Sequence, residues 1–124
     1  MRVTLTYGET KVGGMIFRLN TAVVIKLVVE FSELERAVIK KHKLEDYVWY
    51  NPPLCEAINN PRIQGPSLVS YLLRSTPEKP SHLHFDDLAR ARIEEVKIRD
   101  SLKQLKDTID SLATPIEQSS TFEL

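Results

Sequence analysis

Two histidines and two aspartates fall within one short segment of this sequence. His82 and His84 are separated by a single residue, and Asp86 and Asp87 follow them. On an extended strand, residues two apart point to the same side, so two imidazoles and one carboxylate there can share a metal ion. The candidate metal ligands are therefore His82, His84 and Asp86.

The string at residues 82–87, His-Leu-His-Phe-Asp-Asp, resembles the His-x-His-x-Asp-His motif of metallo-β-lactamase-type hydrolases. In that family the histidines and the aspartate bind zinc, so the resemblance implies a zinc site. Here the last position is Asp87, and the only other histidine is His42. We favour the alternative, in which Asp86 or Asp87 caps a following helix and the histidines lie in a solvated loop. No cofactor is predicted.

Three aromatic residues, Tyr47, Trp49 and Tyr50, form a second candidate ligand site. Such rings can stack on a base or a ring-shaped ligand, although they more commonly pack in a core with their polar groups at its edge. Cys55 is the single cysteine, and a reactive thiolate needs a base or a positive helix end beside it. No histidine is close to Cys55 in sequence, so no catalytic residue is assigned.

A basic segment covers residues 36–43, with five cationic or titratable side chains: Arg36, Lys40, Lys41, His42 and Lys43. Nucleic-acid-binding patches have this composition, and so do ordinary helix C-termini. Acidic residues flank the segment, and the whole chain balances 17 basic against 17 acidic residues. No net field draws the protein to nucleic acid or to an anionic membrane, so nucleic-acid binding is the less favoured interpretation.

The C-terminal part predicts a long amphipathic helix. It begins at Asp86 or Asp87 and runs to about Ala113, because Pro115 stops it. Five apolar residues recur at spacings of four, three, four and three: Ile98, Leu102, Leu105, Ile109 and Leu112. That heptad spacing predicts a seam, and we expect it to join two copies of the chain in a homodimer. The alternative is that the stripe packs on the protein's own sheet.

The rest of the chain predicts an α+β fold. Alternating apolar residues indicate strands over 3–7, 15–19 and 22–31, with a turn from Gly8 to Gly14. Ser32 and Glu35 form a capping box that starts a helix ending near Lys43. Residues 67–74 are ambiguous, and we favour a strand. The predicted fold is an antiparallel sheet of four to five strands, one short helix and the long C-terminal helix.

Length and composition predict one domain over residues 1–113 and a flexible tail over 114–124. The chain has 124 residues, of which 42% are hydrophobic, so it can bury a core without disulfides. The most apolar run, 22–29, is too short to cross a membrane. We expect a soluble cytoplasmic protein, and most of all a non-enzymatic interaction module. A small ligand binder or enzyme is the second hypothesis.

Overall fold

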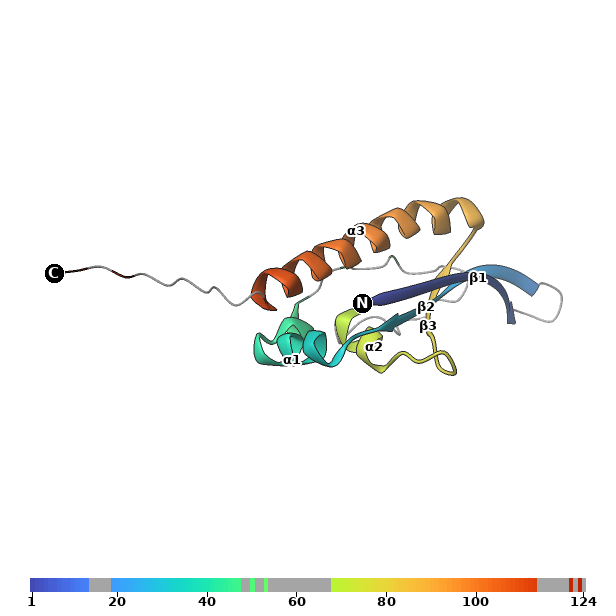
Figure 1. The fold of residues 1–124 in the computed structure, drawn as a ribbon. Helices are drawn as coiled ribbons and strands as arrows, with labels where there is room; N and C mark the ends of the chain where they lie inside the picture. The colour runs from blue at the N-terminus through green and yellow to red at the C-terminus, as the bar shows by residue number, and fades with distance from the viewer. Residues whose placement is uncertain are drawn as a thin grey trace.

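The computed structural model describes residues 1–13, 19–47, 50, 53, 68–113, 121 and 123. Within them a three-stranded antiparallel sheet has the order β1-β2-β3 (Figure 1). The elements follow the chain in this order: β1 (Arg2–Gly13), β2 (Leu19–Glu30), α1 (Glu33–Lys41), a 3-10 turn (Leu44–Asp46), α2 (Leu68–Arg74), β3 (Ser81–Phe85) and α3 (Leu88–Ala113). The long helix α3 lies along one side of the sheet (Figure 1), and the buried residues of α2, Val69 and Leu72, belong to the same core. The predicted α+β class is confirmed.

The central strand β2 is buried on both faces. Ile25, Leu27 and Val29 face α3, while Val24 and Val28 are buried on the opposite side. This near-continuous apolar run is typical of a strand that is covered on both faces. The core of the domain is therefore organised around β2.

The sheet has three strands, so the prediction of four to five was too high. Residues 68–74 form helix α2, and the favoured strand there was wrong. Val69 and Leu72 are both buried, and their spacing of three suits one face of a helix better than the alternation expected of a strand. The histidine segment 81–85 forms strand β3 rather than a loop.

The turn predicted to begin at Gly8 is also wrong, because β1 continues without interruption to Gly13. Gly8 lies opposite Val24 in the register of β1 and β2. A Cβ atom on Gly8 would lie only 3.2 Å from Cγ1 of Val24, so the glycine provides a close approach inside the sheet. Of the strand predicted over 15–19, residues 15–18 lie outside the described residues and Leu19 begins β2.

Helix α1 begins at the predicted capping box. The Ser32 hydroxyl accepts from the Glu35 backbone N–H at 3.1 Å, and Glu35 Oε1 accepts from the Ser32 N–H at 2.9 Å. Helical spacing predicts a buried stripe of Leu34, Ala37, Val38 and Ile39; Val38 and Ile39 are buried, but Leu34 is 64% exposed and Ala37 is also exposed. The carboxylate of Glu35 is buried as well, where it is ion-paired.

Helix α3 starts and ends as predicted. Asp87 Oδ1 accepts from the Arg90 N–H at 2.7 Å, so Asp87 is the capping residue. The helix carries the stripe of Ile98, Leu102, Leu105, Ile109 and Leu112, of which the first four are buried inside the single chain. Self-association stays a prediction, but these four side chains already pack in the core. No helix in the described part of the chain is long and apolar enough to span a membrane.

A substitution pair tests whether the stripe stabilises the single chain. Leu105 is 1% exposed and Leu112 is 41% exposed. We expect Leu105→Ala to lower the free energy of unfolding by about 2–5 kcal/mol, because it leaves a cavity in the core. The matched variant Leu112→Ala should cost about 1 kcal/mol or less. Urea denaturation at several protein concentrations measures both. A midpoint that rises with concentration would instead place the stripe between subunits.

Candidate functional site

Strand β1 is an edge strand of the sheet in the described part of the chain. It pairs with β2 over its full length, from Arg2 opposite Glu30 to Gly13 opposite Leu19, and with no other described strand. In an antiparallel ladder about half of the backbone N–H and C=O groups of an edge strand point away from its partner. These outward groups can accept a further strand.

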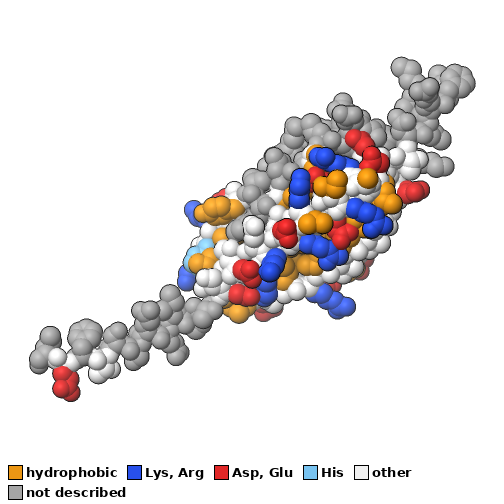
Figure 2. Space-filling model, turned by 90° about the horizontal axis from the view of Figure 1, so that it is seen from above, with side chains coloured by type: hydrophobic (Ala, Val, Ile, Leu, Met, Phe, Trp, Pro, Cys, Tyr) orange, Lys and Arg blue, Asp and Glu red, His pale blue; other side chains and the backbone are white. Residues whose placement is uncertain are grey.

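A groove runs beside this edge, between β1 and α3. Two adjoining cavities of about 420 and 260 Å³ form it, and both are lined by Val3, Arg99 and Leu102. The remaining lining residues are Arg2, Thr4 and Leu5 in the larger cavity, and Met1, Lys103 and Lys106 in the smaller one. Figure 2 views the molecule from the α3 side, where cationic, acidic and apolar side chains are interspersed. We call this surface the edge groove.

One end of the edge groove is held by a buried carboxylate. Glu35 Oε1 lies 2.7 Å from the Met1 ammonium, and Glu35 Oε2 lies 3.1 Å from Nζ of Lys106. Burial on its own would raise the pKa of Glu35, but these partners and the Ser32 bonds outweigh it and lower the pKa from 4.5 to about 2. This ion pair ties α1, the start of β1 and α3 together.

A second carboxylate joins α3 to the middle of β1. The Tyr7 hydroxyl donates to Glu95 Oε1, and Arg99 Nε donates to Glu95 Oε2 at 2.7 Å. Burial and the bond to Glu95 raise the pKa of Tyr7 to about 12. The Tyr7 hydroxyl and then Arg99 lower the pKa of Glu95, so this carboxylate stays ionised. The guanidinium of Arg92 lies 5.8 Å from the centre of the Tyr7 ring.

One cation of the edge groove has no such counter-ion. Among the described residues, no carboxylate lies within 4 Å of Lys103, and no acidic residue lines either cavity. Arg2, in contrast, lies opposite Glu30 in the register of β1 and β2. The groove therefore combines unpaired strand backbone, an apolar floor and surplus positive charge. That arrangement suits an extended polypeptide with carboxylates, and its lining residues include no nucleophile paired with a base.

The predicted metal ligands lie on and after β3, at the other edge of the sheet. His82 and His84 share one face, with ring centres 6.2 Å apart, and His82 lies opposite Lys26 in the register. The structure gathers no group of three or more metal-ligating side chains within its described residues, so Asp86 does not join the two histidines in one cluster.

Two residues of the predicted aromatic site, Tyr47 and Tyr50, lie in different environments. The side chain of Tyr50 is buried, and its hydroxyl donates to Glu94 Oε2 at 2.6 Å. Burial and then the bond to Glu94 raise the pKa of Tyr50 above its usual value. Tyr47 is 58% exposed. Trp49 and Cys55 lie outside the described residues. Tyr50 thus serves as a link to α3, as the core-packing alternative expects.

The basic segment ends α1, where Lys40, Lys41 and His42 are exposed. Arg36 differs from them, because it donates to the Leu73 carbonyl at 3.2 Å and lies 5.9 Å from the centre of the Phe31 ring. Arg36 therefore joins α1 to α2. Lys40, Lys41 and His42 lie at the solvent-exposed end of the helix, and nucleic-acid binding by this segment stays a prediction.

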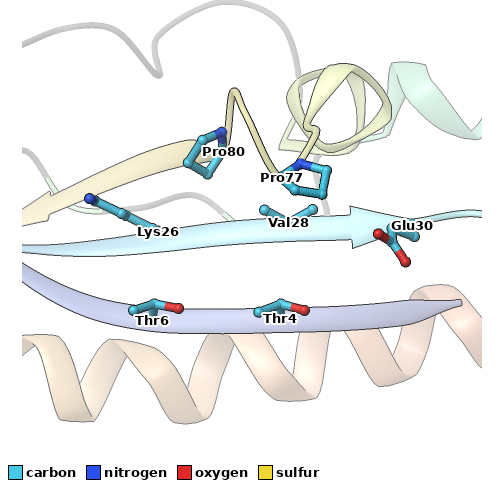
Figure 3. Close-up of a pocket in the computed structure, with 7 residues that line it drawn as sticks. All are labelled: Thr4, Thr6, Lys26, Val28, Glu30, Pro77 and Pro80. Carbon is cyan, nitrogen blue, oxygen red and sulfur yellow. The ribbon is translucent and has the colours of Figure 1, made fainter.

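The sheet face opposite α3 carries a smaller hollow of about 220 Å³ (Figure 3). Its lining residues are Thr4, Thr6, Lys26, Val28, Glu30, Pro77 and Pro80. The threonines and Lys26 point away from α3 toward the prolines of the α2–β3 connection. Its size suits a few water molecules better than a metabolite.

Sequence reasoning missed the residues of the edge groove. Arg2, Arg99 and Lys103 are ordinary surface cations in the sequence, and only the strand order reveals that β1 is an edge. No known protein family, curated protein or solved structure shows significant similarity to this chain.

The Glu35 ion pair predicts a pH-dependent stability. Its pKa is lowered on folding, so its contribution is complete above about pH 4.5 and is lost as the pH falls toward about 2. At pH 7 we expect Glu35→Gln to destabilise the protein by up to about 3 kcal/mol. The exposed Glu33→Gln on the same helix turn is the control. Urea unfolding between pH 2 and 7 measures both; equal effects of the two substitutions would contradict a structural role for this carboxylate.

Proposed function

We propose that this protein is a non-enzymatic protein-interaction module that receives an extended segment of a partner along the edge of β1. The observation that carries the proposal is the twelve-residue edge strand with a groove beside it. Partners that add a strand to a sheet gain affinity from main-chain hydrogen bonds and specificity from pockets for alternate side chains. The edge groove offers both.

The form of β1 supports this use. Protein strands are typically about five or six residues long, and exposed edges are commonly blocked by proline, bulges or short length. Strand β1 contains no proline, and its register with β2 runs without a bulge through all twelve residues. The edge is therefore long and regular, as a docking strand must be.

The other hypotheses have less support from the contacts. Self-association through the α3 stripe would require Leu105 and Ile109 to leave the core. A ligand site built from Tyr50 and His84 would draw on a tyrosine already bonded to Glu94 and a histidine on β3. The edge groove needs no such rearrangement. A homodimer formed by pairing of two β1 strands remains one route to an interaction at this edge.

Amide hydrogen exchange tests whether the edge is open. In the purified protein we expect every second backbone amide between Val3 and Thr10 to exchange rapidly, because those amides face away from β2. The internal control is β2 from Val23 to Leu27, which pairs on both sides and should be protected throughout. NMR detection resolves the two patterns residue by residue.

Light scattering on the same sample completes this test. Uniform protection of β1 in a monomer would mean that the chain covers its own edge, and the proposal would be wrong. Uniform protection in a species of twice the monomer mass would mean that a second copy occupies the edge. Alternate protection in a monomer is the expected result.

A further inference from the structure

We infer that the segment received by β1 is acidic, with glutamate or aspartate side chains that alternate along it and enter the edge groove. This inference rests on the proposed function and names its class of partner. The structure offers the groove lining, the strand register and the charge distribution around β1 as support.

The charge of the edge groove is one-sided. Arg2, Arg99, Lys103 and Lys106 line it, and no acidic residue lines it in the described part of the chain. Two nearby carboxylates are already bonded: Glu35 to Met1 and Lys106, and Glu95 to Tyr7 and Arg99. On the α3 side of the sheet, an incoming carboxylate can therefore pair with Lys103, which has no ion pair with a described acid.

The register of an added strand brings acidic side chains to these cations. Successive residues of a strand alternate between faces, so every second residue of the partner lies on the α3 side of the sheet. There the stem of a glutamate can cover Val3, which is 42% exposed, and its carboxylate can reach the cations on α3. Residues between them lie beside Thr4 and Thr6 on the opposite face.

The same charges disfavour a second copy of this chain as the occupant. A two-fold axis that joins two β1 strands keeps both α3 helices on one face of the continuous sheet. The two cationic flanks, each with Arg99, Lys103 and Lys106, would then face one another. Like charges across an interface oppose association, whereas an acidic segment is attracted.

Synthetic peptides supply the test. The probe is a capped peptide of about ten residues that alternates glutamate and valine, a length that matches a strand. Its counterpart replaces glutamate by lysine, and a third peptide replaces valine by proline and cannot form a ladder. We expect the glutamate–valine peptide to bind at least about tenfold more tightly than either, with weaker binding at about 1 M salt, where charges are screened. It should also protect the outward amides of β1.

A matched pair of charge variants locates the binding. The variant Lys103→Glu reverses a groove cation that has no described counter-ion, and we expect it to weaken peptide binding by about tenfold. The control, Lys40→Glu, makes the same change in net charge at the exposed end of α1. Both side chains are exposed, and thermal melts check that both variants fold.

The outcomes separate this inference from the proposed function. Equal binding of the lysine and glutamate peptides, with protection of β1, would keep the docking edge and overturn the acidic partner. Peptide binding without protection of the β1 amides, or absence of binding at low salt, would also overturn the inference. The proposed docking edge is tested separately, by the amide-exchange pattern of the free protein. A single-stranded oligonucleotide that outcompetes the peptide would show that the groove prefers phosphate, and the inference would be wrong.

Discussion

The packing of α3 against the sheet is the interaction on which the rest of this structure depends. A stripe of Ile98, Leu105 and Ile109 fills one side of the core, and the central strand β2 supplies the other. A three-stranded sheet has too little surface to bury its own apolar face, so it needs this cover. Once α3 lies along the sheet, its flank necessarily comes beside β1, and the edge groove is a consequence of that placement.

Two carboxylates then fix α3 in position. Glu35 and Glu95 join α3 to α1 and to β1, and each is satisfied by more than one donor. Glu35 is buried, so removing one of its partners leaves a poorly solvated charge, which costs more than the intact pair contributes. The same bonds neutralise the negative charge beside the groove and leave Lys103 without a described counter-ion. Structural ion pairs thus set the electrostatic character of the surface.

Local signals in the sequence were sufficient where the structure depends on neighbouring residues. The capping box at Ser32, the cap at Asp87 and the extent of α3 all follow from contacts within one or two helical turns. Tertiary packing decided the ambiguous cases. Residues 68–74 form a helix because Val69 and Leu72 face the core together. In α1, Leu34 is exposed, whereas the carboxylate of Glu35 is buried and ion-paired.

The sequence by itself therefore determined the α+β class, the start of α1, the extent of α3 and the apolar stripe of α3, since hydrophobic period and capping are local properties. Only the tertiary structure decided that the stripe packs within the chain for most of its length and that β1 is an edge. Strand order and ion pairing join residues far apart in the sequence, such as Tyr7 with Glu95 and Glu35 with Lys106. Patterns in a linear sequence carry no information about which of these residues meet, because folding, rather than spacing, brings them together.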